Sequence, residues 1–193
     1  MAVVRARSNT RGEIIDVAMR RFVDQGYDGT SLREIAEDIG VTKAALYYHF
    51  RTKDEIVAAA FDAHVHRIDE LVETIESMPS GDARDEELLS SLEELFAGES
   101  GLVMRFGQVN QAVMSREGFG ARNLEAVTRL MSGLAHGEPD VDSRLRGILA
   151  LGAIVLGTMD HAAEDTLAIG GSAEERRGAA RRIAHELIAG VRG

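Results

Sequence analysis

The chain has 193 residues, of which 45% are hydrophobic and 28% charged, and it contains no cysteine. These values are typical of a globular protein that buries a sizeable core, and they exclude a disulfide framework and thiol chemistry. The formal net charge of −10 argues at first against a nucleic-acid partner. Residues 1–55, however, carry equal numbers of acidic and basic side chains, so the whole excess of acid lies in residues 56–193. This asymmetry indicates two parts with different partners.

The N-terminal sequence MAVVRARSNTRGE lacks the apolar core of a signal peptide. The longest apolar run, residues 147–159, is too short to span a bilayer and is better explained as a buried helix. The absence of cysteine suits a reducing compartment. We therefore expect a cytoplasmic protein with no membrane contact.

Three short helices are predicted in the first 55 residues. The first covers about residues 10–25 and is followed by a glycine cap. Ser31 and Glu34 have the S-x-x-E spacing of a capping box and open the second helix, which a glycine ends at position 40. A third helix is expected at 42–50. Two short helices joined by a tight turn over about residues 31–50 are typical of a helix-turn-helix.

The rest of the chain also has the periodicity of helices, and no segment alternates like a strand. A long fourth helix is predicted from Thr52 to about Ser77. Further helices are expected at about residues 85–97, 101–115, 117–136, 141–164 and 172–190. The sequence therefore predicts an all-α fold, with a three-helix head at residues 1–55 and a larger, roughly six-helix body at residues 56–193.

The third helix has two faces of different character. Val41, Ala45, Leu46 and Phe50 are spaced to point inward, which leaves Lys43, Ala44, Tyr47 and Tyr48 on outward faces, with His49 and Lys53 at the C-terminal edge. A lysine at the start of such a helix donates to guanine O6 and N7, and an alanine permits close approach to a thymine methyl. Tyrosine and histidine side chains can hold phosphates on either side. The alternative is an ordinary exposed helix surface.

The segment TSLREIAEDIGVTKAALYYHFRTKDEI, preceded by F-x-x-x-G-Y, resembles the DNA-binding signature of the TetR family of transcriptional regulators. The resemblance covers residues 11–56; the remainder is similar only in length and all-helical pattern. It implies a homodimer that binds a palindromic operator in double-stranded DNA. The candidate DNA-binding residues are Thr30, Ser31, Thr42, Lys43, Ala44, Tyr47, Tyr48, His49 and Lys53.

Two interpretations stay open for the basic N-terminal residues Arg5, Arg7 and Arg11. They form either an arm that reaches phosphates or the minor groove, or a solvated tail.

The predicted helix at 141–164 is apolar nearly all round, and the last predicted helix carries one apolar stripe. The resemblance implies that these two helices form a four-helix interface with a second copy. The alternative is that they close the core of a single chain. The candidate interface residues are Leu145, Ile148, Leu149, Gly152, Val155, Leu156, Ile183, Leu187 and Ile188.

A small-molecule site is predicted between the body helices, where methionine and phenylalanine side chains adapt to apolar ligands. At any one position, an ordinary core residue is the alternative. The candidates are Phe61, His64, Phe96, Met104, Phe106, Gln108, Gln111, Met114, Phe119, Met131 and Met159. No histidine pair has metal-binding spacing and no catalytic motif is present, so we expect no cofactor, no metal and no enzyme activity.

These patterns predict a cytoplasmic, ligand-responsive transcriptional regulator, most simply a repressor that a small apolar or amphipathic effector releases from DNA. One alternative is an architectural or division-control DNA-binding protein of the same fold without a small-molecule ligand. Another is a helical enzyme or carrier that uses the body alone.

Overall fold

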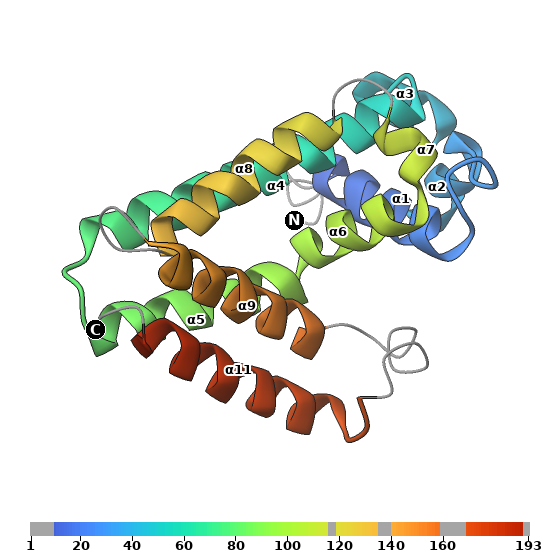
Figure 1. Ribbon diagram of the computed structural model, residues 1–193. Coiled ribbons are helices and arrows are strands. Elements are labelled where there is room, and N and C mark those ends of the chain that lie inside the picture. Colours follow the sequence, from blue (N-terminus) through green and yellow to red (C-terminus); the bar gives the residue numbers. More distant parts are fainter. Residues whose placement is uncertain (1–9, 116–118, 135–139, 159–168, 191–193) are drawn as a thin grey trace, which may run out of the picture. The chain divides into compact units, whose positions relative to one another are not determined.

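The computed structural model describes residues 10–115, 119–134, 140–158 and 169–190 (Figure 1). Within these ranges the regular structure is entirely helical, which confirms the predicted all-α class. The predicted Arg5, Arg7 and Met159 lie outside the described residues. The helices in chain order are α1 (Thr10–Asp24), α2 (Leu32–Asp38), α3 (Lys43–His49), α4 (Lys53–Ser77), α5 (Asp82–Ala97), α6 (Glu99–Val109), α7 (Gln111–Met114), α8 (Phe119–Leu134), α9 (Val141–Thr158) and α11 (Ala173–Ala189).

One predicted helix is broken. The sequence predicts a single helix over about residues 101–115, whereas α6 ends at Val109 and the short α7 begins at Gln111. Asn110 lies between them with φ −121° and ψ 46°, outside the helical region, and its side chain makes no cap bond to α7. Its amide group bonds to another part of the chain instead, which is described below.

The chain folds as two compact units. The first unit contains the described residues up to His64 together with those between 102 and 122, and the second unit contains those between 65 and 101 and from 123 onward. The boundary predicted at residue 55 falls inside the first unit, because the beginning of α4 and most of α6 pack into its core. Three helices, α4, α6 and α8, therefore run from one unit into the other.

An aromatic cluster forms the centre of the first unit. The ring centroid of Phe22 lies 5.2 Å from that of Tyr27 and 5.9 Å from that of Phe106, and Phe61 lies 6.3 Å from Phe106. These rings come from α1, the turn after it, α4 and α6, and tilted or edge-on aromatic pairs stabilise beyond the area that they bury. Around the rings pack the aliphatic residues Ile14, Ala18, Ile35, Leu46, Ile56 and Val103. The three predicted head helices thus share one core with α4 and α6.

Close packing of α9 against α11 characterises the second unit. A Cβ atom added at Gly157 of α9 would lie 2.4 Å from the Cβ of Ala180 on α11, so only a glycine permits this approach. Arg181 of α11 also binds Glu93 and Glu86 of α5. Within the second unit, α5, α9 and α11 thus pack against one another (Figure 1). No helix in the described ranges combines the length and the apolarity that crossing a membrane requires.

Candidate nucleic-acid interface

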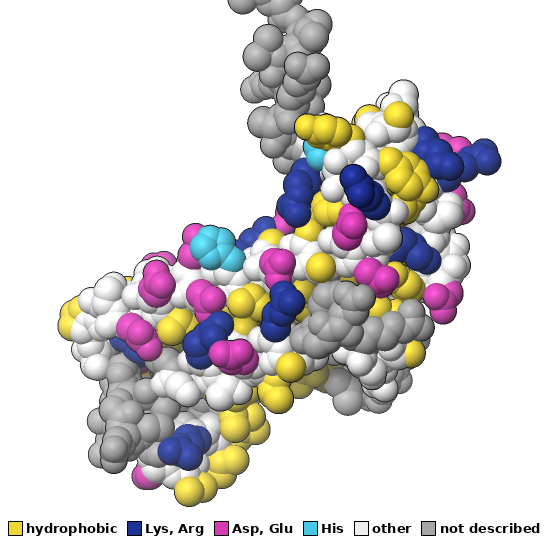
Figure 2. Space-filling model, turned by 90° about the horizontal axis from the view of Figure 1, so that it is seen from above, with side chains coloured by type: hydrophobic (Ala, Val, Ile, Leu, Met, Phe, Trp, Pro, Cys, Tyr) yellow, Lys and Arg dark blue, Asp and Glu magenta, His cyan; other side chains and the backbone are white. Residues whose placement is uncertain are grey.

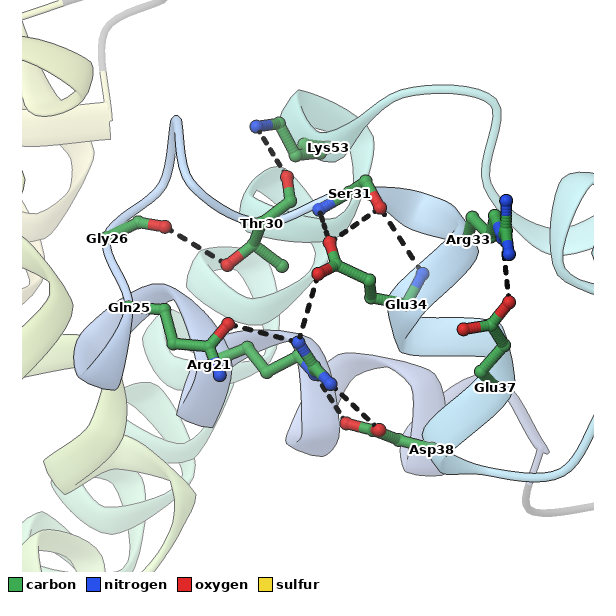
Figure 3. Close-up of polar contacts among 10 residues, drawn as sticks. All are labelled: Arg21, Gln25, Gly26, Thr30, Ser31, Arg33, Glu34, Glu37, Asp38 and Lys53. Atoms are coloured by element: carbon green, nitrogen blue, oxygen red, sulfur yellow. Dashed lines mark hydrogen bonds and ion pairs between the residues drawn. The ribbon is translucent and has the colours of Figure 1, made fainter.

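Side-chain caps delimit the two helices of the predicted helix-turn-helix. The Ser31 hydroxyl accepts the Glu34 N–H at 3.3 Å, and the Glu34 carboxylate accepts the Ser31 N–H at 2.8 Å (Figure 3). This reciprocal pair is the predicted capping box at the start of α2. Thr42 caps α3 by accepting the Ala45 N–H at 3.1 Å. Between the helices Gly40 has φ +69°, a conformation that favours glycine and turns the chain tightly.

An ion pair holds α2 against α1. The Arg21 guanidinium donates to both carboxylate oxygens of Asp38, with a distance of 2.8 Å from Nη2 to Oδ1, and lies 3.8 Å from Glu34 (Figure 3). The hydrogen bond from Arg21 lowers the pKa of Asp38. The pKa of Glu34 is lowered as well, first by its hydrogen bonds to Ser31 and then by the charge of Arg21. Both carboxylates therefore stay charged and hold α2 in place well below neutral pH.

The two faces of α3 lie as predicted. Leu46 and the capping residue Phe50 are buried in the core of the first unit. Tyr48 is 86% exposed and Tyr47 40% exposed, although large aromatic residues usually lose most of their surface in a folded protein. Lys43 and Ala44 are exposed beside them, and His49 is half-buried. A helix of seven residues thus presents two adjacent phenols and an ammonium to the outside.

The exposed side chains of α3 support one another. The Lys43 ammonium lies 5.4 Å from the ring centroid of Tyr47, and the rings of Tyr48 and His49 meet edge to face at 5.3 Å. A cation above an aromatic ring is attracted to it even at an exposed site. These contacts restrict the side chains before any partner binds, which lowers the entropy cost of binding.

Lys53 and Thr30 are less available than the sequence suggests. The Lys53 ammonium donates to the carbonyl oxygens of Tyr27 and Thr30, the latter at 2.9 Å, and lies 4.2 Å from the Tyr27 ring centroid. Thr30 is only 2% exposed, and its hydroxyl donates to the Gly26 carbonyl at 3.0 Å (Figure 3). The Thr30 side chain is thereby withdrawn from the surface, whereas Ser31 and Thr42 remain exposed as helix caps.

Arg11 belongs to α1 rather than to a tail. Its guanidinium carbon lies 5.0 Å from the ring centroid of Phe50, at the C-terminal end of α3, and the residue is exposed. Arg51, which the sequence analysis did not select, is exposed directly after Phe50. The sequence analysis grouped Arg11 with the N-terminal arm or tail, although its predicted first helix begins at about residue 10 and contains this position.

Charge is distributed unevenly over the surface. On the face shown in Figure 2, Lys and Arg side chains lie among hydrophobic ones over the helix-turn-helix, while Asp and Glu side chains are spread over much of the rest. The −10 net charge therefore does not describe the surface that α3 presents. Among the residues described, no group of three or more histidine and acidic side chains is arranged to hold a metal ion.

The predicted effector-site residues that the structure describes differ in burial and in the unit to which they belong. Phe61 and Phe106 are buried in the core of the first unit, Met114 packs against that core, and Gln108 and Gln111 are exposed. The side chain of Phe119 lies outside the described part, as does Met159. The other candidates are buried or half-buried and stay predictions: His64, Phe96, Met104 and Met131.

The predicted interface residues on α9 and α11 divide by exposure. Ile188 is buried within the chain's own second unit, and Gly152, Val155 and Leu187 are half-buried. The remaining five are exposed apolar side chains: Leu145, Ile148, Leu149, Leu156 and Ile183. A groove of about 880 Å³ between the two helices contains Leu156 and Ile183 in its lining, next to Gly157 and Ala180.

One family model and several regulators of known sequence match part of this chain. The family model described as "Bacterial regulatory proteins, tetR family" matches residues 14–60. The HTH-type transcriptional regulator AcrR of Shigella flexneri is 44% identical over 62 residues, which are 32% of this chain and 29% of that protein. TtgR of Pseudomonas putida is 43% identical over 68 residues, 35% of this chain and 32% of that protein. The chain thus aligns with about a third of the length of these relatives.

Solved structures match over nearly the whole chain, at low identity. A TetR-family transcriptional regulator from Bordetella parapertussis has a TM-score of 0.67 at 19% identity, with 93% of this chain and 94% of that chain covered. AibR, solved in complex with isovaleryl coenzyme A and operator DNA, has a TM-score of 0.61 at 20% identity, with 93% and 96% covered. Likeness at this identity establishes the fold alone.

Proposed function

This chain belongs to the tetR family of bacterial regulatory proteins through the head that residues 14–60 match, and we propose that it is a ligand-responsive transcriptional regulator, acting as a repressor. The observation that carries the proposal is α3, whose apolar side is buried while Lys43, Ala44, Tyr47 and Tyr48 face outward. This is the arrangement that a helix needs to enter the major groove of DNA.

Each exposed side chain of α3 has a role in this proposal. Lys43 donates to guanine O6 and N7, and Ala44 leaves room for the base edges. Tyr47, Tyr48 and His49 donate to phosphates and fix the orientation of the helix. Of the predicted backbone contacts, Ser31 and Thr42 are retained at the helix starts and the Thr30 side chain is omitted, because it is buried.

Lys53 has a secondary role in DNA binding in this proposal. A lysine ammonium carries three donors, and the Tyr27 and Thr30 carbonyls use two of them. We assign its main contribution to the shape of the turn before α2 and a weaker one to phosphate attraction. Arg11 and Arg51 are added as phosphate contacts at the C-terminal end of α3, because both are exposed beside Phe50.

Selection of bound fragments from a random DNA library tests the DNA-binding part of this proposal. We expect recovery of a palindromic sequence whose half-sites are separated by roughly 34–36 Å or a multiple, one helical turn of DNA. Tyr47→Ala combined with Tyr48→Ala should abolish specific binding and leave circular dichroism and thermal unfolding nearly unchanged. Asp24→Ala with Gln25→Ala, an adjacent exposed pair at the C-terminal end of α1, is the matched control. Specific binding that survives the tyrosine changes would refute the assignment of α3.

A homodimer is proposed because a stripe of apolar side chains on α9 remains exposed in the single chain. Leu145, Leu149 and Leu156, with Gly152 between the last two, lie at spacings of three, four or seven residues on one side of the helix. Contiguous apolar surface of this kind marks a protein interface. Leu149→Glu should produce monomers in sedimentation at micromolar concentration and weaken operator binding. Glu94→Gln, an exposed change on α5, should have no effect on either.

The regulatory part of the proposal is a population shift that a small apolar or amphipathic effector causes. Such a ligand weakens DNA binding only if it binds the DNA-free conformation more tightly than the DNA-bound one. Metabolite extracts are screened for compounds that raise the unfolding temperature, and each hit is then tested against the recovered operator. Equal operator affinity with and without a saturating hit would rule out this mechanism for that compound.

A further inference from the structure

Asn110 connects three separate pieces of backbone in the first unit. Its Oδ1 accepts the Tyr27 N–H at 3.1 Å, and its Nδ2 donates to the carbonyl oxygens of Phe22 and Phe106, both at 3.3 Å. Phe22 lies in the last turn of α1, Tyr27 in the turn that leads to α2, and Phe106 near the end of α6. The orientation of the amide follows from its partners, because only the oxygen can accept from an N–H and only the nitrogen can donate to carbonyls.

The same turn is also bound by the start of α4. The Lys53 ammonium donates to the Tyr27 carbonyl, and the Tyr27 hydroxyl donates to Asp54 at 2.5 Å. Tyr27 thus has its N–H on the residue that ends α6, its carbonyl and hydroxyl on the first turn of α4, and its ring between Phe22 and Phe106. Two helices that run from one unit into the other are therefore fixed at a single residue, four positions before the N-cap of α2.

Asn110 gives up regular helix structure for these bonds. A chain that continued from α6 into α7 without a break would satisfy its backbone internally, whereas Asn110 has non-helical dihedral angles and leaves α7 without a side-chain cap. The break places the amide group against the α1–α2 turn. An asparagine fits because it supplies a donor and an acceptor at the end of one short side chain, and it competes readily with local helix bonds.

We propose that Asn110 is a positioning residue for the DNA-binding helices: it attaches the C-terminal end of α6 to the turn before α2, so that a displacement of α6 displaces α2 and α3. The inference rests on the proposed function for its effect on DNA. Its structural part, the coupling of residue 110 to α2, is a property of the free protein and is measurable without DNA.

Amide hydrogen exchange in the full-length, DNA-free protein tests the structural part. In Asn110→Ala the Tyr27 amide loses its acceptor and should exchange at least about tenfold faster. If Asn110 positions α2, the Ile35 amide, which bonds to the Ser31 carbonyl, should also exchange several-fold faster, while the amides of α11 keep their rates. Faster exchange confined to Tyr27, or no change at all, would show a purely local role and overturn the proposal.

Two further variants sharpen the test. Asn110→Asp keeps the acceptor for Tyr27 but loses the donor to Phe22 and Phe106, so the Tyr27 amide should stay close to its wild-type rate while α2 still loosens. Val109→Ala changes the other neighbouring side chain, which is 60% exposed and belongs to no candidate site, and should alter neither rate. Asn110→Asp keeps the test decisive if the alanine variant does not fold.

Operator affinity, measured at a temperature at which each variant is folded and dimeric, provides the second readout. We expect Asn110→Ala to bind about tenfold more weakly than wild type and Val109→Ala within twofold. A lower unfolding temperature with unchanged operator affinity would reduce Asn110 to a structural residue and refute the proposal. If the wild-type protein selects no DNA sequence, the proposed function fails, while the exchange rates of Ile35 still decide whether Asn110 is coupled to α2.

Discussion

Gly157 allows a sharp test of how α9 and α11 pack, because a single methyl group decides the outcome. A Cβ atom at this position would lie 2.4 Å from the Cβ of Ala180 and 3.3 Å from the Arg176 carbonyl oxygen. Carbon atoms in contact prefer separations of roughly 3.5–4.0 Å. In Gly157→Ala, α9 and α11 must therefore separate by more than an ångström along this direction, against a close-packed interior.

The net effect combines two opposite contributions. Overpacking of a well-packed site costs about 1–3 kcal/mol, and a contact as short as this one belongs at the upper end. Replacing glycine by alanine inside a helix regains about 1 kcal/mol of helix propensity. We therefore expect Gly157→Ala to lower the free energy of unfolding by about 2 kcal/mol. For a chain of this size this corresponds to a decrease in the unfolding temperature of about 4–8 °C.

Gly152→Ala is the matched control, because it is the same change on the same helix. A Cβ at Gly152 meets no atom within 4 Å in the single chain, so only the helix-propensity gain remains and stability should rise by about 1 kcal/mol. Thermal and urea unfolding are compared at one fixed protomer concentration, because dimerisation changes apparent stability. If Gly152 faces a second copy, sedimentation of this variant should show a weaker dimer even though its fold is more stable.

The reasoning is refuted if Gly157→Ala proves as stable as wild type. A double-mutant cycle gives an independent check, because Ala180→Gly removes the atom that the new methyl meets. Gly157→Ala with Ala180→Gly should recover most of the loss, with a coupling energy of about 3 kcal/mol, the size of the overpacking cost. Additive effects of the two changes would show that the short contact is not the cause.

Three other predictions follow from the first unit. Arg21 lowers the pKa of Asp38 in the folded protein, so the stability from this pair is complete above the unfolded pKa of about 3.9 and disappears as pH falls through the folded pKa. Wild type and Asp38→Asn should thus differ in urea midpoint at pH 6 and converge towards pH 2; a constant difference contradicts this. Leu46→Ala should lose about 2–5 kcal/mol of stability, whereas Tyr48→Ala should stay within about 0.5 kcal/mol and lose operator binding; equal stability losses in unfolding curves would disprove the assigned faces. Operator affinity should fall linearly on a logarithmic scale with salt, by a slope of about −0.9 per phosphate contacted, in binding titrations; a flat response would exclude phosphate contacts.

The helices were predictable where periodicity and caps agreed. The S-x-x-E box at Ser31 places the start of α2 to within a residue, since the side chain and backbone groups involved are neighbours in sequence. The break at Asn110 was not predictable in this way. Its cause is a set of hydrogen bonds to Phe22 and Tyr27, more than 80 residues earlier, and no local pattern reports such partners.

The residues of the candidate sites were likewise predictable only where the local sequence determines their position. The outward position of Tyr47 and Tyr48 follows from the inward position of Leu46 and Phe50, because a short helix has only two sides, and the structure places all four as expected. The effector candidates were chosen by residue type alone. Phe61 and Phe106 have the right type but lie in the aromatic core of the first unit, since apolar residues suited to a ligand are equally suited to a core.

Lys53 is a predicted DNA-contact residue whose side chain also holds the turn before α2. Its position in the sequence indicates a phosphate contact, yet its ammonium lies on the carbonyls of Tyr27 and Thr30, the residues that lead directly into α2. Asn110 binds the N–H of the same tyrosine from the other side. Lys53, which the sequence predicts to contact DNA, and Asn110, to which the sequence analysis gives no role, therefore bind the same turn between α1 and α2. The direction of α3 then depends on where α4 begins and where α6 ends, and a change in either helix reaches the proposed DNA surface through Tyr27.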